Sequence, residues 1–242
     1  MAGWVVLMGG DEFTSGCEEM DSSILRAAAK TPRVVIVPTA AAGQNPSKAA
    51  SNGVGYFRGL GVQASSLMVL ERTAANDNEF LRLVDIADLI YLTGGDPSHL
   101  LTTIHNSLLL EKLLCAVRRG AIVAGSSAAA MVMGSWLRLD GRWIDALGLL
   151  PNVAVLPHHE NNNPNEITGQ LSSTSLNRAT VLGLDSMTCC FGGSTGWKVL
   201  GSGSVTVYYL GRWTRYRNGA NVPLPLVVNT ILHKKPDTEV KS

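Results

Sequence analysis

The stretch GAIVAGSSAAAMVMGSWL, residues 120–137, contains eighteen residues without a charge and carries two adjacent serines, Ser126 and Ser127. An apolar run of about 18 residues is just long enough to be considered as a membrane-spanning helix. Much of this run is glycine, alanine and serine, however, which gain little from lipid. Residues 121–124 form a short apolar run that stops at Gly125, which predicts a buried strand. We therefore expect a strand, a sharp turn that contains the serines, and then a helix.

The composition allows a sizeable hydrophobic core and argues against a strongly charged partner. Of the 242 residues, 45% are hydrophobic and 16% are charged, and the formal net charge is +1. Chains of this length commonly form a single α/β domain, so we expect one domain over residues 1–233. A disordered tail is expected at residues 234–242, where Pro236 lies among charged residues. The weak net charge does not favour nucleic acid or an anionic membrane as the main partner.

The cysteines and the amino-terminal segment favour a reducing, cytoplasmic compartment. The four cysteines show no Cys-x-x-Cys spacing, and Cys189 and Cys190 are adjacent, which suits neither a disulfide framework nor a zinc site. The segment MAGWVVLMGGDEF lacks a basic region and reaches Asp11 soon after its apolar run, which predicts a first strand rather than a signal peptide. Because the sequence contains no metal-binding cluster, dinucleotide fingerprint or P-loop, we expect no metal and no cofactor.

Apolar runs alternate with helical patterns through the first half of the chain. Strands are expected at residues 4–8, 34–37, 66–70, 89–92 and 121–124, and helices at residues 22–30, 47–60, 76–84 and 108–119. This order predicts right-handed β-α-β units, a mainly parallel sheet and helices on both faces. Further short strands, expected at residues 153–156, 188–191, 197–200 and 205–209, suggest an antiparallel extension on that sheet.

The carboxyl ends of the parallel strands are where this architecture places a ligand site. The expected strands run into Gly9-Gly10-Asp11, Pro38-Thr39-Ala40, Gly94-Gly95-Asp96 and Gly125-Ser126-Ser127. All four turns would open on the same edge of the sheet.

The turn at Gly125-Ser126-Ser127-Ala128-Ala129 is similar to the nucleophile elbow G-x-S-x-G, with alanine in place of the last glycine. Small residues are needed there because the serine backbone is strained and the helix passes close to the strand. Ser127 is third in the pattern, where its side chain would project out of the turn. The alternative is that the two serines only cap the helix that follows, since serine is a preferred N-cap residue.

The same segment carries a family resemblance. Residues 125–134, GSSAAAMVMG, resemble the G-T-S-A-G-A-x-V-M-G segment of the S51 serine peptidases, the family of aspartyl dipeptidase (peptidase E) and cyanophycinase. Further similar segments follow in the family's order: LMGGDEF, VVIVPTAAA, LIYLTGGDPSHLL, ALGLLPNVAVLPHH and WKVLGSGSVTVY. The resemblance covers about residues 4–209. It implies a three-layer fold like that of class I glutamine amidotransferases and a serine peptidase that forms an acyl-enzyme.

A nucleophilic serine needs a general base and usually an acid that orients the base. His158 and His159 follow the expected strand at residues 153–156, where either could face the turn. In the family this strand ends in a D-P-H-F or N-P-H-F type of sequence. The resemblance therefore implies His158 as the base, with His159 as the second choice.

Several carboxylates are candidates for the acid that orients the histidine. In the family the acid lies between the serine and the GLGLLP strand, an interval in which this chain has only Asp140 and Asp145. Asp145 comes directly before that strand, where a structural role would explain it, so we favour Asp140 as the orienting acid. Glu160 is a further candidate, because His158 and Glu160 form an H-x-E pair like the one that orients the histidine in class I glutamine amidotransferases. Loss of the orienting acid costs about four orders of magnitude in kcat in the chymotrypsin-type example.

Backbone N–H groups are expected to stabilise the oxyanion. The family uses the glycine pair that Gly94 and Gly95 form here, so we expect the N–H of Gly95 to act together with the N–H of Ala128. These glycines also suit a tight turn before a helix that Asp96 or Ser98 would cap, and both roles are compatible.

Known S51 members cut bonds that involve aspartate, either in Asp-X dipeptides or in the β-aspartyl-arginine linkage of cyanophycin. The cyanophycin branch resembles D-Q-H-F followed by several arginines, whereas this chain continues as HHENNNPNE and has no arginine before Arg178. We therefore expect a short, aspartate-containing peptide as the substrate, cleaved by an exopeptidase or dipeptidase that could be a homodimer. The asparagines could hydrogen-bond such a peptide, although Asn and Pro clusters also form ordinary turns.

Two functions of other classes compete with this interpretation. A catalytically silent binding protein on the same scaffold is favoured by Ala129, by Leu156 and by the unassigned acid. A glutamine amidotransferase-like amidase would share the fold and the H-x-E pair, but that class has a cysteine where this chain has Ser127.

Overall fold

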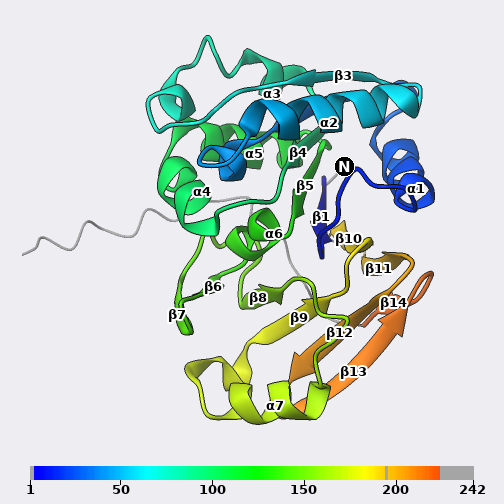
Figure 1. The fold of residues 1–242 in the computed structure, drawn as a ribbon, viewed down its shortest axis with the longest axis vertical. Helices are drawn as coiled ribbons and strands as arrows, with labels where there is room; N and C mark the ends of the chain where they lie inside the picture. Colours follow the sequence, from blue (N-terminus) through cyan, green and yellow to red (C-terminus); the bar gives the residue numbers. More distant parts are fainter. Residues whose placement is uncertain (1–2, 194–195, 224–242) are drawn as a thin grey trace, which may run out of the picture.

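The apolar runs of the sequence form the strands of two β-sheets, which lie one above the other in Figure 1. The computed structural model describes residues 3–193 and 196–223, so the predicted tail at residues 234–242 lies outside the described residues. The strands are β1 (Trp4–Met8), β2 (Arg33–Val37), β3 (Gln63–Ser66), β4 (Leu89–Leu92), β5 (Ile122–Ser126), β6 (Trp136–Leu139), β7 (Arg142–Asp145), β8 (Val153–Leu156), β9 (Thr180–Leu184), β10 (Thr188–Gly193), β11 (Gly196–Gly201), β12 (Ser204–Tyr209), β13 (Arg212–Arg217) and β14 (Asn221–Val222). The helices are α1 (Glu18–Ala28), α2 (Pro46–Gly59), α3 (Arg82–Ile86), α4 (Pro97–Ile104), α5 (Leu108–Arg118), α6 (Ala128–Met133) and α7 (Pro164–Ser172), with short 3-10 helices η1 (Thr39–Ala41), η2 (Ala74–Asn76) and η3 (Ser175–Arg178).

The first sheet has the strand order β14-β11-β10-β1-β5-β4-β2-β3. The strands β1, β5, β4, β2 and β3 are parallel, whereas β10, β11 and β14 are antiparallel. This arrangement confirms the predicted α/β fold with a mainly parallel sheet. Because β1, β5 and β4 are parallel neighbours, their carboxyl ends meet at one edge, as the sequence predicts.

Helices cover both faces of the first sheet, as the alternation along β1 shows. Val5 and Leu7 belong to the core that also contains buried residues of α4, α5 and α6. Val6 and Met8 belong to a second core, with buried residues of α1 and α2. A strand buried on both faces needs an unbroken apolar sequence, which is what the predicted strands have.

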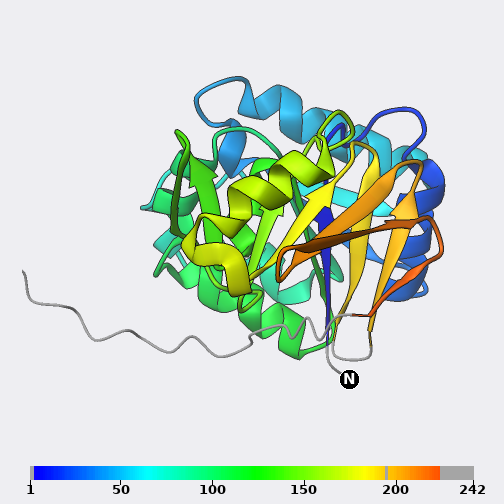
Figure 2. The same ribbon diagram turned by 90° about the horizontal axis from the view of Figure 1, so that it is seen from below.

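The second sheet, β13-β12-β9-β8-β6-β7, differs from the predicted antiparallel extension. The strands expected at residues 153–156 and 205–209 belong to this separate sheet, whereas β10 and β11 do extend the first one. One face of the second sheet packs on the same core as α6, through Val155, Leu182 and Val207. Its other face packs against α7, which crosses the sheet in Figure 2. The apolar residues of β8, β9 and β12 are therefore buried on the faces of the second sheet, although these strands do not join the first sheet.

The uncharged stretch at residues 120–137 forms β5, the turn, α6 and the first part of β6, and its apolar side chains lie in the core. Within residues 3–193 and 196–223, no single helix has the length and apolar composition to cross a membrane. The pair α4 and α5 meets that test only when taken together, and the two helices are bent by 88° at their junction.

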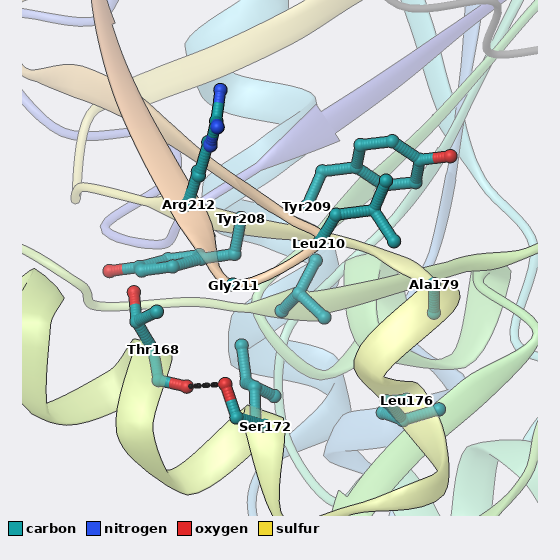
Figure 3. A pocket seen from close by; sticks show the side chains of 11 residues that line it. Thr168, Ser172, Leu176, Ala179, Tyr208, Tyr209, Leu210, Gly211 and Arg212 are labelled. Atoms are coloured by element: carbon teal, nitrogen blue, oxygen red, sulfur yellow. Dashed lines mark hydrogen bonds between the residues drawn. The ribbon is translucent and has the colours of Figure 1, made fainter.

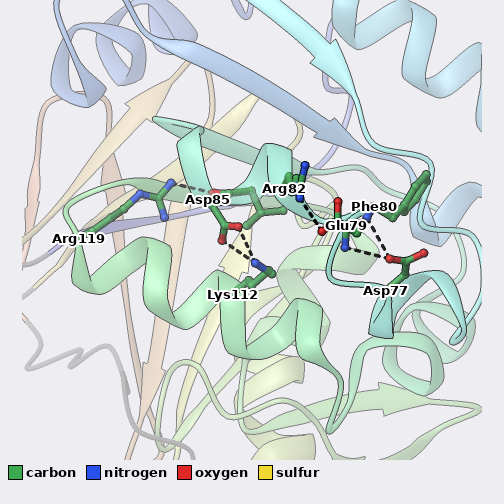
Figure 4. Close-up of polar contacts among 8 residues, drawn as sticks. Asp77, Glu79, Phe80, Arg82, Asp85, Lys112 and Arg119 are labelled. Atoms are coloured by element: carbon green, nitrogen blue, oxygen red, sulfur yellow. Dashed lines mark hydrogen bonds and ion pairs between the residues drawn. The ribbon is translucent and has the colours of Figure 1, made fainter.

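Several expected elements have other bounds than the sequence pattern suggests; the helix expected at residues 22–30, for example, is α1, which begins at Glu18. The strand expected at residues 66–70 is β3, which ends at Ser66. The helix expected at residues 76–84 is replaced by turns and the short α3, because the carboxylate of Asp77 accepts hydrogen bonds from the N–H groups of Glu79 and Phe80 at 3.0 and 3.2 Å (Figure 4). Lys112 of α5 binds both carboxylate oxygens of Asp85 of α3, at 2.8 and 2.6 Å, so these two helices are also joined by an ion pair.

Candidate active site

Ser127 occupies a strained turn between β5 and α6. Its backbone has φ 50° and ψ −110°, a positive φ that residues other than glycine rarely adopt. A Cβ atom at Gly125 would lie 2.5 Å from Met133 Sδ and 3.0 Å from the backbone carbon of Ala129, so a larger residue there would crowd the start of α6. The methyl group of Ala129 itself is fully buried and accommodated. The Ser127 hydroxyl makes no capping hydrogen bond to α6, so it is not occupied in the way that the N-cap alternative requires.

His158 brings its imidazole to this hydroxyl from the second sheet. The distance between His158 Nε2 and Ser127 Oγ is 3.1 Å, within hydrogen-bond reach. The residue follows β8 and Pro157, has φ 49°, and donates its N–H to the carbonyl oxygen of Gly9 at 2.9 Å. That backbone bond ties the end of β8 to the end of β1, and it places the base beside the nucleophile.

The other ring nitrogen of His158 faces a serine rather than a carboxylate. Its Nδ1 lies 3.1 Å from Ser186 Oγ, and Ser186 lies between β9 of the second sheet and β10 of the first. The Ser186 hydroxyl donates to Glu160 Oε1 at 3.3 Å, and the Ser186 N–H donates to Glu160 Oε2 at 3.1 Å. The resulting chain of contacts runs Ser127, His158, Ser186, Glu160.

Glu160 is held in its ionised form. Partial burial raises the pKa of its carboxyl group, but hydrogen bonds from its own N–H and from the N–H and hydroxyl of Ser186, together with the charge of His158, outweigh this effect and lower the pKa below its usual value. At neutral pH this side chain therefore carries a negative charge that can stabilise an imidazolium on His158 through Ser186.

This geometry corrects the expectation for Asp140. Asp140 lies in the turn between β6 and β7, has φ 48° and is exposed, whereas Nδ1 of His158 is taken by Ser186. The turn forms because β6 and β7 pair as a hairpin, which the sequence does not predict. Asp145 is an exposed residue at the end of β7. Of the three candidate carboxylates, only Glu160 reaches His158, and it does so through an intervening hydroxyl.

His159, the second choice for the base, is part of the interior of the second sheet. It is 1% exposed, its Nε2 lies 2.6 Å from the hydroxyl oxygen of Tyr208, and burial lowers the pKa of its imidazole. The adjacent Gly183 leaves room for the ring, since a Cβ atom there would lie 2.6 Å from its Nε2. His159 is therefore a buried packing residue.

Gly95 and Ala128, the expected oxyanion donors, lie at the ends of neighbouring strands. Gly95 has φ 144° and follows β4, and Ala128 is the first residue of α6. Within the described residues, neither N–H donates a hydrogen bond to another protein group. The N–H of Gly94, by contrast, donates to the carboxylate of Glu12 at 2.8 Å. The two open donors and the helix N-terminus fit the requirement for preorganised dipoles near a developing negative charge.

Gly10 sets the position of the imidazole, and this leads to a first prediction. Gly10 has φ 134°, and a Cβ atom there would overlap the His158 ring, 2.6 Å from Nε2. Gly10→Ala is expected to displace the ring and to slow reaction at Ser127 about 100-fold, the cost of an error of roughly 1 Å in a reacting group. The measurement is the rate of modification by a fluorophosphonate, with the melting temperature as a check on folding. Gly55→Ala, in α2 with no atom within 4 Å of the added Cβ, is the control. A folded Gly10→Ala protein that reacts at the wild-type rate would contradict this role.

Two other features of the described structure carry less chemistry than this site. Among the described residues, no group of three or more His, Cys, Asp or Glu side chains is placed to hold a metal ion. A hollow between α7 and the turn from β12 to β13, lined by Thr168, Ser172 and Tyr208 (Figure 3), has room for about one water molecule. Neither feature competes with the arrangement around Ser127.

Two residues of the site are absent from the sequence prediction. Ser186 follows β9, a strand that the sequence pattern does not show, and Glu12 follows β1 but carries no motif that points to Ser126. For Ser186 the available signal is only its position in a loop after a strand, whereas Glu12 also lies in the family-like segment LMGGDEF, in which it has no role predicted from the sequence. A position in a loop after a strand is shared by many polar residues that have no part in a site.

Comparison with known proteins gives a consistent result. Residues 5–191 match the model of peptidase family S51. The cyanophycinase of Trichormus variabilis is 29% identical over 248 residues, which cover 95% of this chain and 81% of that protein. The crystal structure of a peptidase from an acI-B1 actinobacterium has a TM-score of 0.81 and 26% identity, with 92% of this chain and 97% of that chain covered. A putative peptidase E protein from Listeria monocytogenes EGD-e has a TM-score of 0.63 at 18% identity, over 84% of this chain and 100% of that chain, a likeness of fold alone.

Proposed function

This chain belongs to peptidase family S51, and from that premise we propose that it hydrolyses a short, aspartate-containing peptide through an acyl-enzyme on Ser127. The observation that carries the proposal is the 3.1 Å contact between Ser127 Oγ and His158 Nε2, formed by residues from different sheets. A hydroxyl on a strained turn, an imidazole within reach and open N–H donors are the parts that acyl transfer needs.

The proposed reaction begins with attack of Ser127 Oγ on the substrate carbonyl carbon, while His158 Nε2 takes the hydroxyl proton. The negative charge that develops on the carbonyl oxygen is stabilised by the N–H groups of Gly95 and Ala128. The C–N bond then breaks, and His158 passes the proton to the leaving amine. A water molecule, deprotonated by the same imidazole, hydrolyses the acyl-enzyme and restores the serine.

The contact at Nδ1 supports the base in this scheme. A hydrogen bond from Nδ1–H to Ser186 Oγ would keep Nε2 free of a proton, so that it can accept one from Ser127. Glu160 in turn accepts a hydrogen bond from the Ser186 hydroxyl, and its negative charge stabilises the imidazolium that forms. Ser186 and Glu160 are thus positioning residues that act through His158.

Aspartate in the substrate is supported by the relatives rather than by a pocket. The curated relatives are cyanophycinases, and the family resemblance of the sequence also includes the aspartyl dipeptidases. The substrates implied for both branches contain aspartate, and the loop after His158 carries the asparagines Asn161, Asn162 and Asn163 in place of arginines. A short peptide with a free terminus is therefore preferred to a polymer, and a dipeptidase or other exopeptidase to an endopeptidase.

The direct test is covalent labelling with a fluorophosphonate, which reacts with an activated serine. Because His158 lies beside Ser127, we expect one label per chain, on the peptide that contains Ser127, as read by mass spectrometry. Heat-unfolded protein, in which the imidazole no longer adjoins the hydroxyl, is the control and should not react. Absence of label on the folded protein would favour a catalytically silent binding protein on the same scaffold.

A further inference from the structure

A carboxylate lies beside the proposed nucleophile and is used by none of the steps above. Glu12, in the loop after β1, is half-buried and has one hydrogen bond to each oxygen. Its Oε1 accepts the N–H of Gly94 at 2.8 Å, and its Oε2 accepts the hydroxyl of Ser126 at 2.7 Å. It therefore joins the ends of three neighbouring strands, β1, β4 and β5.

Gly94 shows how near this carboxylate is to the reacting hydroxyl. A Cβ atom built at Gly94 would lie 3.2 Å from Glu12 Oε1 and 3.3 Å from Ser127 Cβ, so both side chains flank the same point. Gly94 also directly precedes Gly95, the proposed oxyanion donor. A substrate carbonyl held against Ser127 would thus have the Glu12 carboxylate as a neighbour.

The charge of Glu12 is not neutralised within the described part of the protein. The ion pairs found there join other residues, and none includes Glu12. Acidic groups lie in this region: burial raises the pKa of Asp21 to about 7 against the lowering effect of a hydrogen bond from Tyr56, and the charges of Glu18 and Glu12 raise it further. Exposed Asp11 lies next to Glu12 in the chain.

A negative charge at this point opposes the oxyanion, since two like charges repel more strongly where water is partly excluded. A positive charge that the substrate brings to this point would offset that repulsion. Each carboxylate oxygen of Glu12 accepts a single hydrogen bond and retains capacity for a further donor. An ammonium group is the donor that gains most, because both charge and hydrogen bonding then contribute.

We propose that Glu12 is a specificity-determining residue, whose carboxylate binds a primary ammonium group on the substrate residue that supplies the scissile carbonyl. An α-ammonium group is attached to the carbon next to the scissile carbonyl, so it would lie close to a carboxylate that adjoins the nucleophile. A cation at the end of a long side chain would lie farther from that carboxylate. The substrate would then be cleaved after its amino-terminal residue. This inference rests on the proposed function and names the substrate class of the same site.

The test compares two diphenyl α-aminoalkylphosphonates that differ only at nitrogen, one with a free ammonium group and one N-acetylated. Both report the rate of covalent modification of Ser127, read from the labelled peptide. We expect wild-type protein to react about tenfold faster with the ammonium probe, the effect of one partly buried ion pair. In Glu12→Gln, which keeps the shape and can still accept the N–H of Gly94, the ratio of the two rates should fall to about one.

Asp11→Asn is the matched control, because it removes a neighbouring exposed charge from the same loop and should leave the ratio unchanged. If Glu12 only supports the loop, Glu12→Gln will slow both probes equally and the ratio will persist, which overturns the inference. A wild-type ratio of one or less overturns it as well. If Ser127 reacts with a neutral fluorophosphonate but the two phosphonate probes do not give the expected ratios, only the role of Glu12 is refuted. If Ser127 reacts with none of the probes, both the proposed function and this inference are refuted.

Discussion

Ser127→Ala is expected to lower kcat/KM for peptide hydrolysis by at least about 10⁴-fold, because the acyl-enzyme can no longer form. What activity remains would come from the open N–H donors and from substrate binding, which do not replace the nucleophile. The substitution removes a hydroxyl that has only His158 as its hydrogen-bond partner among the described residues, so the fold should persist. The assay uses Asp-X dipeptides, a β-aspartyl-arginine dipeptide and cyanophycin, with free amine as the readout.

The panel of three substrate types tests the role of Ser127 separately from the identity of the substrate. Ser51→Ala, an exposed serine in α2, is the control and should retain full activity. Turnover that depends on Ser127 for any member of the panel supports the mechanism, and the member cleaved fastest identifies the substrate class. Unchanged turnover in purified Ser127→Ala protein would exclude this residue as the nucleophile, whatever the substrate is.

Ser186→Ala is expected to give the second-largest effect, a fall in kcat of about 100-fold with little change in KM. The substitution leaves Nδ1 of His158 without its partner and disconnects Glu160, so the imidazole loses both its orientation and the nearby negative charge. The cost should stay below the loss of about 10⁴-fold known for removal of a directly bound acid, because the carboxylate here acts only through a hydroxyl. Kinetics with the best substrate of the panel provide the measurement.

Three companion variants make this prediction specific. Ser186→Thr keeps a hydroxyl and should restore most of the activity, which a general loss of packing would not allow. Glu160→Gln should lower kcat less than Ser186→Ala, and the double variant should be no worse than Ser186→Ala, because the two residues act in series. Asp140→Asn should have no effect, since this residue lies in an exposed hairpin turn. A large loss in Asp140→Asn with none in Ser186→Ala would reverse the assignment made from the geometry.

Much of the fold could be predicted because its signals are local. The apolar runs that become β1, β4 and β8 have the bounds expected from the sequence, since a strand buried on both faces must be apolar throughout and stops where Gly, Pro or Asp begins. The turn at Ser127 is equally local, because Gly125 and the alanines that allow it are its neighbours in the chain. The position of His158 follows from its place directly after a strand end.

The remaining parts of the site depend on contacts between distant segments. Ser186 is 28 residues from His158, and Glu12 is 114 residues from Ser126, and neither pair shares a motif. Asp140 was the natural choice of acid by interval along the chain, yet pairing of β6 with β7 directs it into an exposed turn. The sequence by itself determined the parallel sheet, the strained serine and the histidine that follows β8, because each is encoded by residues adjacent in the chain. Only the tertiary structure decided which groups meet Nδ1 of His158 and which carboxylate lies beside the nucleophile, because these contacts depend on how the second sheet and the loop after β1 pack against the first sheet.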